Sequence, residues 1–272
     1  MGYTEPMTSF KDGFCQLLVD AGYHVIRFDN RDVGLTSKTQ GNPPDLQAII
    51  TAVMAGQTHP QVPYTLEYMA ADAFAVLDAA SISSAHIVGV SMGGYIAQTM
   101  AITNPKRLES MTSIMSTTGA PGVGIATPEV GTNLRSPLGI ETKEEAVEWS
   151  LHNYRLFAGP LFDEEAHKSL AASNYERNWN PLVTVFQLAA MLTGPDRTED
   201  LQSIEVPTLV IAGENELDDL SNDYDGLIGQ DIYLNTPETT MKILYEIGNG
   251  GHSSAESPTG YVGNKTLIWS QY

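Results

Sequence analysis

The sequence predicts an α/β protein with a mostly parallel sheet, helices on both faces and a helical insertion. Short apolar runs alternate with amphipathic helical segments along most of the 272 residues, which is typical of strands joined by helical crossovers. Between residues 117 and 205 the periodicity is helical only, and Gly and Pro mark the junctions. We therefore expect a core formed by residues 1–116 and 206–272, with a helical cap at 117–205.

The individual elements follow from residue periodicity and from turn residues. Apolar residues at helical spacing predict helices, in chain order, over 10–21, 64–80, 93–103, 142–157, 163–177 and 181–192. Aliphatic runs bounded by turns predict buried strands over 23–30, 85–90, 108–116, 206–213 and 240–248. We expect the helical insertion to lie over the carboxyl edge of the sheet, where ligands bind in open α/β sheets.

Composition narrows the class of partner. The net charge of -19, from 14 basic and 33 acidic residues, repels nucleic acid and anionic lipid, so we expect neither as a partner. The longest apolar runs are too short to span a membrane, and "MGYTEPMTSF" lacks the basic start and apolar stretch of a signal peptide. These features predict a cytoplasmic protein, or a secreted one if the N-terminus is truncated. Composition does not predict the oligomeric state.

Cysteine and metal-ligand patterns predict no bound group. Cys15 is the single cysteine, so an internal disulfide is impossible. His, Cys and Asp residues show no ligand spacing, and we expect no metal and no cofactor.

One short motif is typical of a serine nucleophile. Gly89-Val90-Ser91-Met92-Gly93 is a G-x-S-x-G sequence between a predicted strand and a predicted helix, the context that a nucleophile elbow requires. The sharp turn exposes a hydroxyl at the N-terminus of a helix, where backbone N–H groups favour a developing anion. We expect Ser91 to be the nucleophile and the N–H of Met92 to be one oxyanion donor.

A serine nucleophile needs a base, usually a histidine that a carboxylate orients. Of the six histidines, His252 alone follows the last predicted strand, in the glycine-rich loop "GNGGHSSAESP". The acid is expected after the strand at 206–213. In the loop that follows, Glu216 stands three residues beyond Gly213 as the candidate acid, and Asp218 is the alternative acid.

Longer stretches carry a family resemblance. "FCQLLVDAGYHVIRFDNRDVGLTSK", "GVSMGGYIAQTMA" and "FDEEAHKSLAAS…GPDRTEDLQSIEVPTLVIAG" resemble α/β-hydrolases of the aclacinomycin methylesterase type, over about residues 1–213. From residue 214 to 272, "ENELDDL", "DIYLNTPETTMKILYEIGNGGHSSAES" and "YVGNKTLIWSQY" resemble the C-terminal part of cutinase-like polyester hydrolases, including poly(ethylene terephthalate) hydrolases. The sequence therefore predicts a bipartite chain with a seam near residue 213.

The resemblance implies an α/β-hydrolase fold and roles for particular residues. The acid of both families falls at Glu216, where aspartate is usual, and the polyester hydrolases place their histidine at His252. "RFDNRDVG" shapes a turn in the superfamily, which implies structural roles there. "MGYTEPMTSF" resembles the loop after the third strand of the family, so we expect the strands before it to be missing. Met1 or Gly2 would then supply the second oxyanion N–H.

Together these residues predict a cofactor-free serine carboxylic ester hydrolase. It would act on a small or medium ester through an acyl-enzyme, and the apolar cap residues expected to contact the substrate are Trp149, Phe157 and Phe186. An extended polyester is the alternative substrate, although the predicted cap disfavours it because a long chain needs an open groove. A non-catalytic hydrolase-fold binding protein or an incomplete pseudoenzyme is the alternative from another class.

Overall fold

The computed structural model describes residues 1–124, 132–133, 136–157, 162–213 and 242–247. The described α-helices are α1 (Asp12–Asp20), α2 (Leu46–Met54), α3 (Leu66–Ala79), α4 (Met92–Thr103), α6 (Lys143–Phe157), α7 (Glu164–Glu176), α8 (Val183–Leu192) and α9 (Thr198–Leu201). The described strands are β1 (Ala85–Val90), β2 (Leu108–Ile114), β3 (Thr208–Gly213) and β4 (Lys242–Ile247). No helix within the described ranges is both long enough and apolar enough to cross a membrane.

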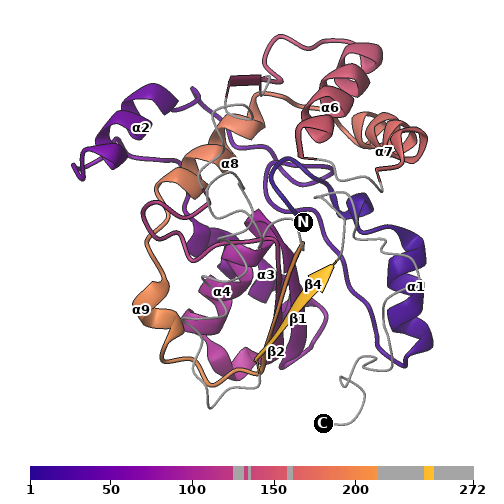
Figure 1. The fold of residues 1–272 in the computed structure, drawn as a ribbon, viewed down its shortest axis with the longest axis vertical. Coiled ribbons are helices and arrows are strands. Elements are labelled where there is room, and N and C mark those ends of the chain that lie inside the picture. Colours follow the sequence, from indigo (N-terminus) through magenta and orange to yellow (C-terminus); the bar gives the residue numbers. More distant parts are fainter. Residues whose placement is uncertain (125–131, 134–135, 158–161, 214–241, 248–272) are drawn as a thin grey trace.

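The four described strands form one parallel sheet in the order β1-β2-β3-β4 (Figure 1). Val90 pairs with Ile114, and Ile114 pairs in turn with Ile211, so β1, β2 and β3 end at one edge of the sheet. Parallel strands need crossover connections, and α4 provides the one between β1 and β2. The carboxyl end of β1 is thus placed beside the start of α4.

One face of the sheet is covered by α4, which packs on β1 and β2, and by α3, which packs on α4 (Figure 1). The inner side of α3 buries Leu66, Met69 and Leu77, as its helical periodicity predicts. Leu66 and Met69 join Ile96 and Met100 of α4 in the main apolar core. Burial of this cluster holds α4, and with it the corner that precedes α4, against the sheet.

The strand predicted at 23–30 is wrong, because these residues form no strand and belong to no sheet. A strand needs a neighbour that completes its backbone hydrogen bonds. Within the described ranges, no strand stands between this segment and β1. The contact with β1 is instead between side chains, since the ring of Tyr23 meets the ring of His86 edge-on at 5.5 Å.

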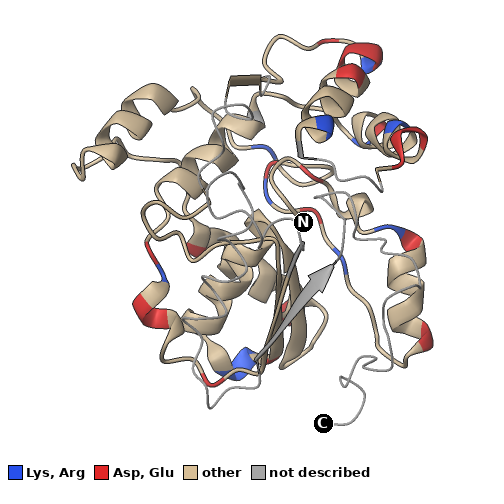
Figure 2. Ribbon diagram, viewed as in Figure 1, with Lys and Arg blue, Asp and Glu red and all other residues tan. Residues whose placement is uncertain are grey.

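Helices α6 and α7 lie beyond the carboxyl ends of the strands, in the direction of the β4 arrow (Figure 1). They pack on each other through Leu151 of α6 and Ala171 of α7. Charged side chains gather on these two helices (Figure 2), and Arg155 of α6 donates to Glu164 of α7 at 3.0 Å. Helix α8 contributes the buried Phe186 to the main core.

Candidate active site

Ser91 occupies a strained corner between β1 and α4. Its φ of 53° and ψ of −117° are rarely adopted by any residue except glycine. The Ser91 N–H donates to the carbonyl oxygen of Ile114 at 2.8 Å, and the Ser91 carbonyl accepts from the N–H of Gly94 at 2.8 Å. These two bonds fix the corner to the end of β2 on one side and to the first turn of α4 on the other.

Glycines around Ser91 make so tight a corner possible. A Cβ atom at Gly89 would stand 2.1 Å from the carbonyl oxygen of Gly93. A Cβ atom at Gly94 would stand 2.4 Å from the side chain of Ser116. Both distances are far shorter than any real carbon contact, so a side chain at either position would displace the elbow.

The N-terminal loop also packs against the corner. A Cβ atom at Gly2 would lie 3.9 Å from the Ser91 hydroxyl oxygen, and one at Gly93 would lie 3.0 Å from the carbonyl oxygen of Met1. The backbone of residues 1 and 2 is therefore packed directly on the elbow. The N–H of Glu5 donates to the carbonyl of Gly2 at 3.3 Å, which closes a tight turn immediately after this contact.

Met92 is the first residue of α4, and its side chain is 0% exposed within the core. The first N–H groups of a helix have no acceptor inside that helix, and the helix dipole adds positive charge there. The backbone N–H of Met92 therefore belongs to the first turn of α4, directly after Ser91, and the N-terminal loop packs on the same corner.

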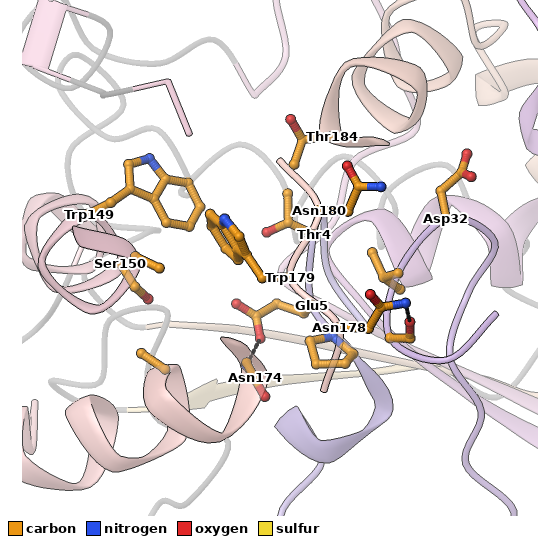
Figure 3. Close-up of a pocket in the computed structure, with 15 residues that line it drawn as sticks. Thr4, Glu5, Asp32, Trp149, Ser150, Asn174, Asn178, Trp179, Asn180 and Thr184 are labelled. Atoms are coloured by element: carbon orange, nitrogen blue, oxygen red, sulfur yellow. Dashed lines mark hydrogen bonds between the residues drawn. The ribbon is translucent and has the colours of Figure 1, made fainter. Parts of the chain in front are cut away.

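A cavity of about 50 Å³ lies on the cap side of the N-terminal loop (Figure 3). This volume holds a few water molecules. Its lining comes from residues 4–6, residues 32–34, α6, α7, residues 178–180 and Thr184. Trp149 of α6 stands over the cavity with its ring against that of Trp179, at 5.5 Å between centroids (Figure 3).

Glu5 is the centre of a polar cluster beside this cavity. Its carboxylate accepts from the hydroxyl of Tyr154 on α6 at 3.1 Å, from the amide of Asn174 on α7 at 3.1 Å, and from Ser9. Burial raises the pKa of Glu5, although these hydrogen bonds act in the opposite direction. The cluster joins the N-terminal loop to two helices of the predicted cap.

A buried amide provides a second connection between the loop and the cap. Gln187 of α8 is 0% exposed, and its Oε1 accepts from the N–H of Thr4 at 2.9 Å. Its Nε2 donates to the carbonyl oxygen of Arg31 at 2.9 Å. The sequence analysis missed both Glu5 and Gln187. A signal existed for Gln187, which interrupts the apolar helix "VTVFQLAAML".

His167 of α7 is buried, at 7% exposure. Its Nε2 lies 2.9 Å from the hydroxyl oxygen of Ser150, and its ring lies 3.9 Å from that of Tyr154. Burial lowers the pKa of His167 to about 4, with a smaller contribution from the charge of Lys11. A neutral imidazole therefore packs inside the predicted cap, close to the Glu5 cluster.

The "RFDNRDVG" segment makes structural contacts. The Asp29 carboxylate accepts from the N–H groups of Met7 at 2.8 Å and Leu35 at 2.9 Å, and from the guanidinium of Arg177 at 2.9 Å. Burial alone would raise the pKa of Asp29, but these donors hold it below its ordinary value. Arg31 forms a bidentate ion pair with Asp72, with both contacts at 2.7 Å.

The remaining predicted site residues lie partly within and partly outside the residues that the structure describes. Phe186 is 1% exposed and packs inside the main core, the position of a structural residue. Phe157 ends α6, and its side chain is outside what the structure describes. The predicted base His252, the predicted acid Glu216 and the alternative acid Asp218 lie outside the described residues. The described chain thus brings together Ser91, Met92, Met1 and Gly2, whereas Trp149 lines a cavity to which none of these four residues contributes.

Comparison with known proteins identifies the family. Residues 9–257 match the alpha/beta hydrolase fold family, a range that crosses residue 213. The rhodomycin D methylesterase DnrP of Streptomyces peucetius is 29% identical over 227 residues, which are 75% of this chain and 69% of that protein. The rhodomycin D methylesterase DauP of a Streptomyces species is 30% identical over 230 residues, again 75% and 69% of the two chains.

Solved structures with the same fold are more distant in sequence. A thermophilic esterase from Thermogutta terrifontis has a TM-score of 0.57 and 21% identity, over 93% of this chain and 80% of that one. A 2-hydroxy-6-oxo-6-phenylhexa-2,4-dienoate hydrolase from a Rhodococcus species has a TM-score of 0.64 and 16% identity, over 93% and 81%. The elbow at Ser91, the parallel sheet and the match over residues 9–257 lead to one conclusion: the chain belongs to the α/β-hydrolase fold family.

Proposed function

We propose that this protein is a serine carboxylic ester hydrolase that cleaves a small or medium ester through an acyl-enzyme. The observation that carries the proposal is the position of Ser91, held at a φ of 53° at the N-terminus of α4. Such a corner costs free energy, and it presents the hydroxyl to a site bordered by backbone N–H groups. The two methylesterase relatives support ester chemistry.

The proposed reaction has two halves. The Ser91 Oγ attacks the ester carbonyl carbon while His252 takes the hydroxyl proton, and Glu216 orients the imidazole. The N–H of Met92 and one N–H of the N-terminal loop stabilise the negative oxygen of the tetrahedral intermediate. The C–O bond to the alcohol then breaks, and His252 returns the proton to the departing alkoxide. Water, activated by the same histidine, attacks the acyl-enzyme and releases the carboxylic acid and free Ser91.

We further propose that the helices of residues 117–205 act as a cap that limits the size of the substrate. Helices α6 and α7 lie beyond the carboxyl ends of the strands, and Trp149 of α6 faces the cavity next to the N-terminal loop. A cap in this position favours a compact ester over an extended polymer. The relatives named as methylesterases make methyl esters the first substrates to test.

The test is ester turnover by the purified chain and by Ser91→Ala. We expect the wild-type chain to hydrolyse p-nitrophenyl acetate and butyrate and to release acid from methyl esters in a pH-stat, and Ser91→Ala to lose this activity. Absence of turnover on all of these esters by a folded wild-type chain would favour the non-catalytic alternative. Release of soluble products from a poly(ethylene terephthalate) film faster than from small esters would favour the polyester alternative.

A further inference from the structure

We propose that Gln187 is a positioning residue, through which the predicted cap sets the geometry of the oxyanion loop. This inference rests on the proposed function, because it concerns the same reaction. It assigns a role to a residue that touches neither the substrate nor Ser91. The chain of contacts runs from α8 through Gln187 and Thr4 to Gly2 and the elbow.

The first link is a strained turn. The N–H of Glu5 donates to the carbonyl of Gly2, and Thr4 inside this turn has a φ of 66°. Turns with a positive φ at the third position usually have Gly or Asn there. A β-branched residue such as threonine is strained in this conformation, which persists only where surrounding contacts impose it.

The second link is the contact that imposes the turn. Gln187 Oε1 accepts the Thr4 N–H at 2.9 Å, and Gln187 Nε2 donates to the Arg31 carbonyl at 2.9 Å. Both ends of the amide are thus used, which fixes its orientation. Gln187 is 0% exposed, so water does not compete for these groups. The amide locks the turn to α8 and to the loop after residue 30 at the same time.

The third link is the distance to the reacting atoms. Thr4 is two residues from Gly2, where a Cβ atom would stand 3.9 Å from the Ser91 hydroxyl oxygen. The backbone of Met1 packs on Gly93 at the start of α4, where a Cβ atom would stand 3.0 Å from the Met1 carbonyl oxygen. If the turn relaxes, the N–H that the loop offers to the oxyanion moves with it. Transition-state stabilisation is sensitive to such displacements, because about 1 Å can cost on the order of a hundredfold in rate.

Gln187→Met tests the first part of the proposal, because it keeps the approximate volume of the side chain and removes both hydrogen bonds. We expect kcat on p-nitrophenyl butyrate to fall roughly tenfold to a hundredfold, while KM stays close to the wild-type value. Thr193→Val is the matched control, since it removes a side-chain hydrogen bond to Ala189 from the end of the same helix and should leave kcat unchanged. Equal kcat in Gln187→Met and the wild type, or a change confined to KM, would overturn the inference.

Recovery of kcat by a second substitution distinguishes a positioning role of Gln187 from a merely structural role. Glycine adopts a positive φ without strain, so Thr4→Gly in the Gln187→Met background should restore most of the lost kcat. A double variant that stays as slow as Gln187→Met contradicts the proposal. If Gln187→Met does not fold, Thr4→Pro removes the same N–H donor and excludes a positive φ without altering α8. It should show the same loss of kcat, and retention of kcat by a folded Thr4→Pro overturns the proposal.

The outcome also distinguishes this inference from the proposed function. An active wild type with an unaffected Gln187→Met contradicts the positioning role alone. A folded wild type without ester turnover contradicts the proposed function, and the positioning role falls with it.

Discussion

The carbonyl oxygen of Gly93 lies 2.1 Å from the point where a Cβ atom of residue 89 would stand. The atom in the way belongs to the backbone at the start of α4, so it cannot rotate aside as a side chain would. The strained conformation of Ser91 therefore depends on glycine two residues before it.

We predict that Gly89→Ala displaces the elbow, lowers the free energy of unfolding by roughly 1–3 kcal/mol and abolishes ester turnover. Thermal unfolding and a p-nitrophenyl ester assay measure the two effects. Gly13→Ala in α1 is the matched control, because a Cβ atom there meets nothing within 4 Å. That change should leave stability equal or raise it by up to about 1 kcal/mol. Equal melting temperatures for Gly89→Ala and the wild type would contradict the close approach.

Glu5 should make the free energy of unfolding decrease as the pH rises. Burial raises its pKa above the ordinary value of 4.5, so the folded state holds the proton more tightly than the unfolded chain does. The free energy of unfolding should therefore fall as the pH rises from about 4.5 through the raised pKa. In Glu5→Gln, which keeps acceptor and donor groups without a charge, we expect this slope to disappear. Urea unfolding at pH 4 to 8 measures the free energy of unfolding of the wild type and of Glu5→Gln. If this free energy varies equally with pH in both proteins, the assignment of the pH dependence to Glu5 is contradicted.

His167 should make the free energy of unfolding fall as the pH decreases. Its pKa of about 4 lies below the ordinary 6.5, so unfolding takes up a proton in this range. Stability is then lost as the pH falls from 6.5 to 4. We expect His167→Gln, which can still hydrogen-bond Ser150, to be less sensitive to acid. His24→Gln, at an exposed position, should retain the wild-type acid transition. A wild-type response in His167→Gln would show that another group controls the transition.

The base and acid are predicted outside the described residues, and activity is their test. We expect His252→Ala to lower turnover by several powers of ten, and Glu216→Gln to lower it far more than Asp218→Asn. Glu216→Asp should retain or improve turnover, since it restores the aspartate usual at this position. The pH–rate profile should rise through a group near the ordinary histidine pKa of about 6.5. If Asp218→Asn is the more damaging change, the acid is Asp218.

Much of the fold was predictable where the sequence is strongly periodic. The strand at 85–90 was predicted with the bounds of β1, and the helix at 64–80 matches Leu66–Ala79 closely. The segment at 23–30 has the apolar pattern of a strand, but pattern does not reveal whether a neighbouring strand is present to pair with it. Helix α2 was missed, although Asp45, whose side chain accepts from the N–H of Ala48, was a readable start signal.

In the candidate site, residues that belong to a short local motif were predictable, and residues that act through contacts distant in the sequence were not. Ser91 and Met92 were predictable, because a short motif between a strand and a helix defines the elbow. Glu5 and Gln187 act through partners more than 100 residues away in sequence, such as Tyr154 and Thr4. No periodicity within either segment predicts which residue it will meet. The contacts that hold the N-terminal loop therefore became visible only in the structure.

The central claim is that Ser91 is an activated nucleophile, and site-mapped covalent labelling tests it most directly. A fluorophosphonate probe reacts with activated serines, and peptide mass spectrometry identifies the modified residue. We predict one adduct, on Ser91 within the peptide that contains "VGVSMGG", and no adduct on Ser91→Ala or after His252→Ala. Labelling at another serine, or labelling that survives Ser91→Ala, would contradict the account.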